Sequence, residues 1–191
     1  MSGLAGILTL CFGGGFALLA IVAVWAILLY NRLVVLRNRV DNAWAQIDVQ
    51  LKRRYDLIPN LVETVKGYAA HERETLEEVI KARQIAMDAS SIAEHGQAEN
   101  MLTSTLRSLF AVAEAYPDLK ANQNFMMLQE ELSGTESKIA YARQFYNDSV
   151  MSYNTGIQVF PANLLAGMFG FSKRDSFEIE DVAKDAPKVS F

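Results

Sequence analysis

The residues closest to a catalytic motif are His71-Glu72-Arg73-Glu74-Thr75. In zinc proteases a helix carries histidines at positions i and i+4, which places two imidazoles on one face with a glutamate base between them. Thr75 stands at the position of the second histidine, and the chain's other histidine, His95, lies in a separate polar stretch. We therefore expect no metal site and interpret His71 as part of a solvated helix face.

Carboxylates and hydroxyls form no better constellation. Di-iron bundles place Glu-x-x-His on two helices, and this sequence has no such pair. It also lacks a Gly-x-Ser-x-Gly elbow, a phosphate-binding loop and a dinucleotide fingerprint. The glutamates that we interpret as solvated helix faces are Glu63, Glu72, Glu130, Glu131 and Glu136. The sequence thus predicts a protein that is not an enzyme and needs no cofactor, with a metal-dependent enzyme as the least favoured alternative.

Cysteine usage and charge exclude further classes. The single cysteine, Cys11, lies inside an apolar run, where it can form neither an internal disulfide nor a Cys–His nucleophile. The chain of 191 residues has 18 Lys and Arg against 22 Asp and Glu, a formal charge of −4. Because no basic stripe with interleaved aromatic residues occurs, we expect no nucleic-acid partner.

The N-terminal part of the chain is a long apolar run. No charged side chain occurs from Leu4 to Tyr30, a stretch about 40 Å long as a helix. It exceeds the hydrocarbon core of a bilayer, is too long for a signal peptide, and is not closed by a small-x-small site. Trp25 and Tyr30 stand near its end, where an aromatic belt meets the headgroups. We therefore predict a retained transmembrane anchor over residues 1–31.

Residues in and after the anchor predict its packing and its orientation. Gly13 and Ala17 have small-xxx-small spacing, which lets anchor helices approach closely. Arg32, Arg37 and Arg39 follow the anchor directly, whereas no Lys or Arg precedes it. The positive-inside rule therefore predicts a single-pass protein with its N-terminus outside and the remainder in the cytoplasm.

Beyond the anchor, apolar residues recur every three or four positions, as in amphipathic helices. The longest stripe comprises Phe125, Leu128, Leu132, Ile139, Ala142, Tyr146, Val150 and Tyr153. Since no run alternates with period two, we predict an all-α fold. Four such helices with short connections favour an antiparallel up-and-down four-helix bundle over residues 32–156, after the N-terminal transmembrane helix.

Caps and helix breakers predict where the helices begin and end. Asp56 followed by Pro59 predicts the start of the second helix, with the carboxylate as cap and the proline in the first turn. Residues 90–96 form a polar pause, and Asp118 is placed to cap the last helix. Gly134 is a weak point inside that helix.

The stretch QLKRRYDLIPNLV, residues 50–62, is then expected to be the corner between the first two helices. Its cations, Lys52, Arg53 and Arg54, suit the dipole of a helix's last turn. A partner contact at this tip, far from the membrane, is the alternative that stays open.

Residues 160–171 follow the last helix and carry no charge. This stretch is too short to span a bilayer. If the chain reverses at the predicted corner, the stretch returns to the membrane side, where it lies in the headgroup region or covers the end of its own bundle or a neighbouring copy's. The side chains that would make this contact are Leu164, Leu165, Met168, Phe169 and Phe171. The uncharged stretch belongs to a segment that we place over residues 157–171, and we expect a flexible tail over residues 172–191.

Several long blocks, in order, resemble the LemA family of bacterial membrane proteins. They are YNRLVVLRNRVDNAWAQIDVQLKRRYDLIPNLVETVKGYAAHE, AEAYPDLKANQNFMMLQEEL, ARQFYNDSVMSYN and FPANLLAGMFGF. The resemblance covers about residues 30–171 and implies an anchor in the bacterial cytoplasmic (inner) membrane and an up-and-down four-helix bundle. It assigns no catalytic residue. Some relatives are associated with membrane-compartment formation, and others with genes for a membrane metalloprotease.

These features together predict a membrane-anchored, non-catalytic scaffold that self-associates or recruits partners at the bacterial membrane. The partners that we expect are membrane lipid, further copies of the chain, and another membrane protein such as a protease. An adaptor or regulator of a membrane protease is the alternative function.

Overall fold

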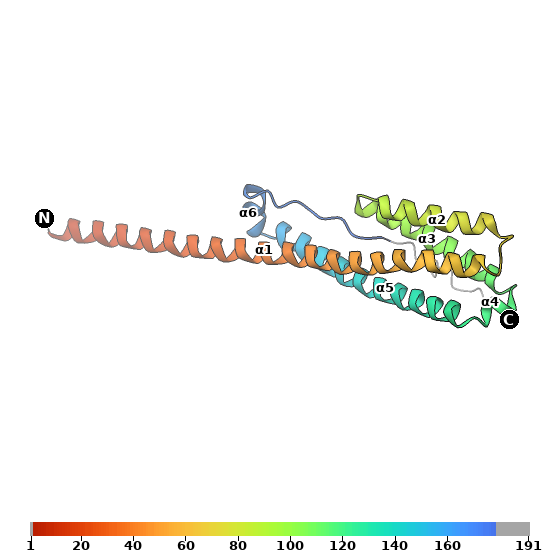
Figure 1. The fold of residues 1–191 in the computed structure, drawn as a ribbon. Coiled ribbons are helices and arrows are strands. Elements are labelled where there is room, and N and C mark those ends of the chain that lie inside the picture. Colours follow the sequence, from red (N-terminus) through yellow and green to blue (C-terminus); the bar gives the residue numbers. More distant parts are fainter. Residues whose placement is uncertain (1, 179–191) are drawn as a thin grey trace, which may run out of the picture. The chain divides into compact units, whose positions relative to one another are not determined.

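The computed structural model describes residues 2–178, with side chains from residue 13 onward. Within this range every regular element is a helix, which confirms the all-α prediction. In chain order the helices are α1 (Ser2–Lys66), α2 (Arg73–Asp88), α3 (Ile92–Ala113), α4 (Pro117–Lys120), α5 (Gln123–Gln158) and α6 (Ala162–Met168), as labelled in Figure 1.

The helices form two compact units, and the two longest, α1 and α5, contribute to both. Of the described residues, unit 1 contains 2–42 and 148–174, and unit 2 contains 43–147 and 175–178. Unit 1 therefore holds the apolar part of α1, the end of α5 and the whole of α6. Unit 2 holds the remainder of α1 and α5 together with α2, α3 and α4.

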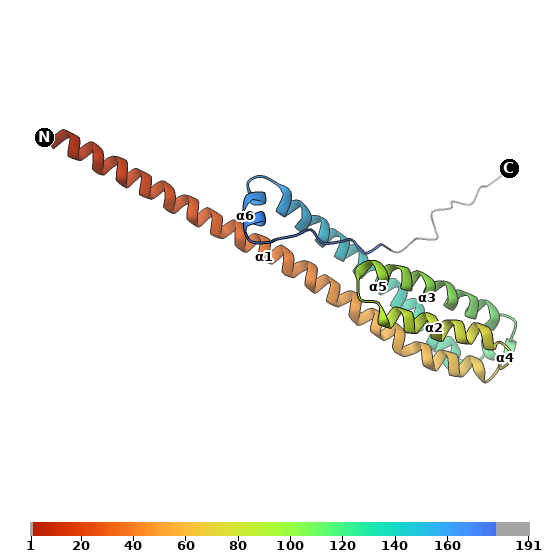
Figure 2. The same cartoon turned by 90° about the horizontal axis from the view of Figure 1, so that it is seen from above.

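Unit 2 is a four-helix bundle, in which α2 and α3 lie side by side with the parts of α1 and α5 that belong to this unit (Figure 1 and Figure 2). Each helix turns its apolar stripe inward, because burial of that stripe supplies most of a helix's stability. Its fully buried side chains include Ile47, Leu51, Ile58, Leu61, Val65, Val79, Leu102, Leu109 and Tyr146.

The corner between the first two helices is not at residues 50–62. Pro59 lies inside α1, which continues to Lys66, and the chain reverses over residues 67–72. A proline removes one helical hydrogen bond, but the apolar stripe of α1 continues past it, and burial of that stripe outweighs the loss. The buried residues of this continuation are Ile58, Leu61, Val62 and Val65. The helix start expected at Asp56 is therefore wrong.

The start of α3 also differs from expectation. This helix begins at Ile92, inside the polar pause expected over residues 90–96. Ser91 and Glu94 form a capping box in which the Ser91 hydroxyl accepts from the Glu94 N–H at 3.2 Å. The Glu94 carboxylate in turn accepts from the Ser91 N–H at 3.1 Å. Because a capping box satisfies two donors that a helix start leaves unpaired, the polar residues initiate the helix instead of interrupting it.

The helix α5 begins at a different cap and shows no weak point. Asn122, not Asp118, provides the cap, since its side-chain oxygen accepts from the backbone N–H of Phe125 at 3.0 Å. The helix passes Gly134 without a break over its 36 residues. A single glycine costs only about 1 kcal/mol relative to alanine, which a helix with a long buried stripe tolerates.

In unit 1 the apolar part of α1 exposes large side chains such as Phe16, Leu19 and Ile21. Within the described residues, α1 alone combines the length and the apolar composition that crossing a bilayer requires, which fits a membrane protein. Past the apolar run, the end of α5 covers α1 closely. A Cβ added at Gly156 would lie only 2.9 Å from the Leu36 side chain.

Candidate functional site

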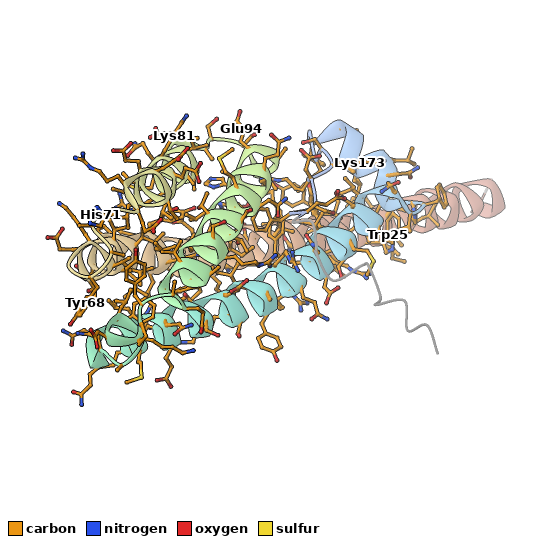
Figure 3. All side chains as sticks on the ribbon, turned by 90° about the vertical axis from the view of Figure 1, so that its right-hand side faces the viewer. Trp25, Tyr68, His71, Lys81, Glu94 and Lys173 are labelled. Carbon is orange, nitrogen blue, oxygen red and sulfur yellow. The ribbon has the colours of Figure 1, made fainter. Side chains whose placement is uncertain are left out.

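The two histidines of the chain belong to different parts of unit 2. His71 lies in the exposed turn after α1 (Figure 3), and its neighbour Glu72 accepts a hydrogen bond from the Tyr116 hydroxyl at 3.0 Å. His95 lies in the first turn of α3, with its ring centroid 5.4 Å from that of Trp44. Among the residues that the structure describes, no group of three or more His, Cys, Asp or Glu is arranged to hold a metal ion.

Unit 2 contains a buried ion pair at a position where the sequence predicts an exposed cation. Arg54 of α1 donates to Glu99 of α3 at 2.9 Å, and the two side chains are 5% and 1% exposed. The Tyr55 hydroxyl donates to the other oxygen of the same carboxylate at 2.6 Å. Arg54 also donates to the Thr103 hydroxyl at 2.9 Å. Buried charges persist only with such partners, so the cluster fixes α3 against α1.

We interpret this cluster as structural, because its charged groups already bind one another. Burial raises the pKa of Tyr55, and the negative charge of Glu99 raises it further, so the phenol stays protonated and continues to donate. A signal for the pair exists in the sequence. Glu99 stands on the apolar stripe of α3, three positions before Leu102, and a carboxylate on such a stripe indicates a buried partner.

The three cations predicted to form a partner contact at the tip have different environments. Arg54 is buried against Glu99 and is therefore not available to a partner. Arg53 forms an exposed ion pair with Glu131 of α5, and Lys52 is exposed. Lys52 and Arg53 remain candidates for such a contact, but they lie within α1 and not at a corner.

The uncharged stretch after α5 lies beside α1 at the end of the apolar run in unit 1 (Figure 1 and Figure 2). The ring centroids of Phe169 and Phe171 are 4.9 and 5.8 Å from that of Tyr30, both in edge-to-face geometry. The Arg37 guanidinium lies 5.4 Å from the centre of the Phe171 ring. These aromatic and cation–π contacts fix the stretch against the last turn of the apolar run.

The pattern of burial in α6 is the opposite of that expected for a helix in water. The helix buries its small residues, Ala162 and Ala166, and exposes large apolar ones. Leu164 is 61% exposed, Met168 is 78% exposed, and Phe160, just before the helix, is 79% exposed. Burying one such side chain contributes about 1.5–3 kcal/mol, so a helix surrounded by water favours the opposite arrangement. Of the five predicted contact residues, Leu164, Met168 and Phe169 are exposed, and Leu165 and Phe171 are half-buried.

The chain after α6 is held by side chains of α5. In unit 1 the Tyr153 hydroxyl donates to the Ser172 carbonyl at 2.9 Å. The Asn154 amide bonds both backbone groups of Arg174, donating to its carbonyl at 2.8 Å and accepting from its N–H at 3.0 Å. The Arg174 side chain then donates to Asp41 at 3.2 Å. The first residues of the expected flexible tail are therefore hydrogen-bonded to α5 and α1.

Side chains of α5 bind the following part of the chain in the same way within unit 2. The Asn147 amide accepts from the Phe177 N–H at 2.8 Å and donates to the Phe177 carbonyl at 3.1 Å. The Tyr146 hydroxyl donates to the Asp175 carbonyl at 2.9 Å. The Phe177 ring is fully buried, with its centroid 5.5 Å from that of Trp44. Residues 175 and 177 of the expected flexible tail are thus hydrogen-bonded to α5, and the part of that prediction after residue 178 lies outside the described residues.

The small residues proposed for packing of the anchor are exposed on α1. A Cβ added at Gly13 would meet nothing within 4 Å, and Ala17 is exposed as well. The side chain of Cys11 lies outside the described ones. Contact between anchors through Gly13 and Ala17 therefore stays a prediction.

A shallow apolar groove lies between α1 and α5 in unit 2. Its volume is about 630 Å³, and it is lined by Ala45, Gln46, Val49, Gln50, Lys138, Tyr141, Ala142 and Phe145. Val49 and Tyr141 are strongly exposed there, and Lys138 is the charged residue of this lining. Exposed aromatic and aliphatic side chains with little charge among them are typical of a surface that binds protein.

Known proteins resemble this chain over most of its length. The sequence model of the LemA family matches residues 43–191. Protein LemA of Metamycoplasma hominis is 28% identical over 83% of this chain and 74% of its own length. Magnetosome protein MamQ 2 of Paramagnetospirillum magneticum is 26% identical over 91% of this chain and 74% of its own length. Magnetosome protein MamQ of Magnetospirillum gryphiswaldense is 24% identical over 84% and 68%, respectively. None of these names describes an enzyme.

Proposed function

Because the chain belongs to the LemA family, we propose that it is a membrane-anchored helical scaffold without catalytic activity, which self-associates or recruits partners at the bacterial membrane. The observation that carries this proposal is α6, which directs Leu164 and Met168 outward beside the last turn of the apolar run. One apolar helix tethers a protein to a bilayer. A second lipid-facing element next to it also limits the protein's tilt, and an oriented platform is what a scaffold requires.

In this proposal α6 lies in the headgroup region of the leaflet in which the anchor ends. Trp25 and Tyr30 are residues of an aromatic belt. Contact of Phe169 and Phe171 with Tyr30 gives α6 the same depth as this belt. Apolar area moved from water into lipid contributes about 25 cal/mol per Å², which favours insertion of the exposed side chains of α6.

The proposed orientation puts the N-terminus outside and the bundle in the cytoplasm of a bacterial cell. Arg32, Arg37 and Arg39 support it, because they follow the apolar run directly. A cysteine at an exposed bundle position such as Glu78 tests it, in a chain with Cys11 replaced by serine. We expect that a membrane-impermeant maleimide does not label this cysteine in intact cells. Labelling before lysis would indicate the opposite orientation.

For self-association we propose that the groove between α1 and α5 binds a second copy of this chain. Both copies are confined to one membrane, which raises their effective concentration and favours a symmetric contact. The groove offers exposed Val49 and Tyr141 with a single charged residue, Lys138, in its lining. A groove with few charges can face a copy of itself without strong like-charge repulsion.

Cysteine crosslinking tests the scaffold function. In the background without Cys11, Tyr141→Cys is expected to crosslink in native membranes, whereas Glu78→Cys on α2 serves as the matched exposed control. A strictly monomeric protein in mild detergent, with no crosslink at residue 141 and no co-purifying partner, would contradict the proposal. Stoichiometric co-purification of a membrane protease with a monomer would support the adaptor function in its place.

A label on α6 tests its contact with lipid. A fluorophore on Met168→Cys is expected to be quenched by spin-labelled lipid, whereas the same fluorophore on Lys81→Cys in unit 2 is not. Equal quenching at both positions, or at neither, would contradict the interfacial placement of α6.

A further inference from the structure

The charges of the chain are unevenly divided between its two units. Unit 1 carries five cations and two carboxylates, a formal charge of +3, although the whole chain carries −4. The rest of the chain therefore carries −7. The cations of unit 1 are Arg32, Arg37, Arg39, Lys173 and Arg174, and its carboxylates are Asp41 and Asp148. The unit that contains the apolar part of α1 is thus the positive one.

The cations of unit 1 come from two distant parts of the sequence that meet in the fold. One set follows Tyr30 on α1, and the other follows Phe171 at the end of the uncharged stretch. The Tyr30 and Phe171 ring centroids are 5.8 Å apart, and Arg174 donates to Asp41 of α1 at 3.2 Å. Both sets therefore gather next to the point where the apolar run ends.

All five of these cations are exposed. We call three of them, Arg32, Arg37 and Lys173, the basic collar. Arg37 lies over the Phe171 ring, and a guanidinium on a ring face still presents N–H donors at its edges for a phosphate. Arg37 follows Tyr30 by about 10 Å along the helix axis. This distance is about one Debye length at physiological salt, so the whole collar is in range of headgroup charge.

We propose that the basic collar and α6 together form a binding surface for anionic phospholipids, with the collar cations on the phosphate groups around α1 and the outward side chains of α6 on the acyl chains. The inference rests on the membrane placement of α6 proposed above. An acidic protein would use the charge of the collar but would leave Leu164 and Met168 exposed. A lipid satisfies both parts of the surface, and for that reason we assign the site to lipid.

Reconstitution of the full chain tests this site, with Met168→Cys labelled in the background without Cys11. Energy transfer from the label to acyl-labelled phosphatidylglycerol is compared with transfer to acyl-labelled phosphatidylcholine in vesicles that contain both lipids. We expect preferential transfer to phosphatidylglycerol, reduced about fivefold for each collar cation changed to glutamine. Arg37→Lys keeps the charge and is expected to retain the preference. The control matched to the variant with all three collar cations changed is Lys52→Gln with Lys81→Gln and Arg107→Gln. It removes the same charge from unit 2 and is expected to leave the lipid preference unchanged.

The possible outcomes distinguish failure of the collar site from failure of the proposed function. A quenched label with no preference for phosphatidylglycerol would overturn the collar site and leave the interfacial placement of α6 intact. An equal loss of preference in the unit 2 control would also overturn it, because net charge alone would then explain the effect. A label that no lipid quenches would contradict the placement of α6 itself.

Discussion

The Arg83 guanidinium donates a hydrogen bond of 2.7 Å to the backbone carbonyl of Tyr55. In a regular helix that carbonyl accepts from the N–H four residues later, and here the residue four positions later is Pro59, which has no N–H. A side chain of α2 therefore satisfies the acceptor that the proline leaves unpaired. The same bond connects α2 to α1 at Tyr55, the residue after Arg54, whose pair with Glu99 connects α3 to α1.

Replacing Arg83 with methionine is expected to lower the free energy of unfolding by about 1–3 kcal/mol, because the Tyr55 carbonyl then lacks a donor. In a Pro59→Ala background, the new N–H of residue 59 supplies that donor, and the same replacement is expected to cost less than about 1 kcal/mol. Chemical denaturation of the four proteins of this cycle in mild detergent measures the coupling. Equal costs in both backgrounds would show that Arg83 acts independently of the proline.

Breaking the buried Arg54–Glu99 pair is expected to have a larger effect on the free energy of unfolding. Glu99→Gln leaves the Arg54 charge buried without its counter-ion and is expected to cost about 3–5 kcal/mol. Changing both residues to methionine removes both charges and is expected to recover most of that loss. The matched exposed pair is Arg53 with Glu131, and Arg53→Ala is expected to cost less than about 1 kcal/mol. Thermal unfolding followed by circular dichroism compares them, and a similar cost for Glu99→Gln and Arg53→Ala would refute the structural role.

The sequence predicts the helices of this protein well because their apolar stripes are long and regular. It misplaces the first corner because the rule that proline begins or breaks a helix is local. The donor that makes Pro59 tolerable, Arg83, is distant in the sequence. The capping box of Ser91 and Glu94 fits a recognisable pattern, but the polar residues around it resemble a loop.

The candidate site is predictable in part for a similar reason. The missing charge and the length of residues 160–171 are visible in the sequence, and they indicate a short apolar segment near the membrane. The side of α6 that faces outward depends on where Phe169 and Phe171 rest, which is against Tyr30. A contact between residues so far apart in the chain leaves no periodic signal. The burial of Arg54 depends in the same way on the distant Glu99.

Two glycines in unit 2 are expected to respond in opposite directions to alanine. Gly134 lies inside α5 with nothing within 4 Å of an added Cβ, so Gly134→Ala is expected to stabilise the fold by about 0.5–1 kcal/mol. At Gly96 an added Cβ would collide with the carbonyl oxygen of Glu178, so Gly96→Ala is expected to displace residues 175–178. Melting temperatures and amide exchange of the Phe177 N–H measure the two effects. Destabilisation by Gly134→Ala would indicate a contact on that face of α5.

Phe177 is expected to hold the end of the described chain on the bundle. Phe177→Ala removes a fully buried ring that packs on Trp44, a change that typically costs about 3–5 kcal/mol. Because the ring belongs to a terminal segment, the loss is expected as local release. The backbone N–H of residue 177, now bonded to Asn147, should then exchange rapidly. Ser176→Ala, at an exposed neighbour, is the control, and persistent protection of the 177 N–H in the alanine variant would contradict this role.

Acid is expected to weaken the start of α3 through Glu94. Its carboxylate accepts from the Ser90 N–H and hydroxyl, both at 2.8 Å, and from the Ser91 N–H. These bonds, those from Ser90 above all, lower the pKa of Glu94 from 4.5 to about 2. A lowered pKa means that the contribution to stability is complete above pH 4.5 and is lost as the pH falls through about 2. The melting temperatures of the natural protein and of Glu94→Gln should therefore converge over this window.

Carbon-detected NMR titration of the Glu94 carboxylate checks the midpoint directly, and Ser90→Ala should raise this midpoint by removing one donor. A midpoint at the ordinary value in the natural protein would mean that the capping box does not form.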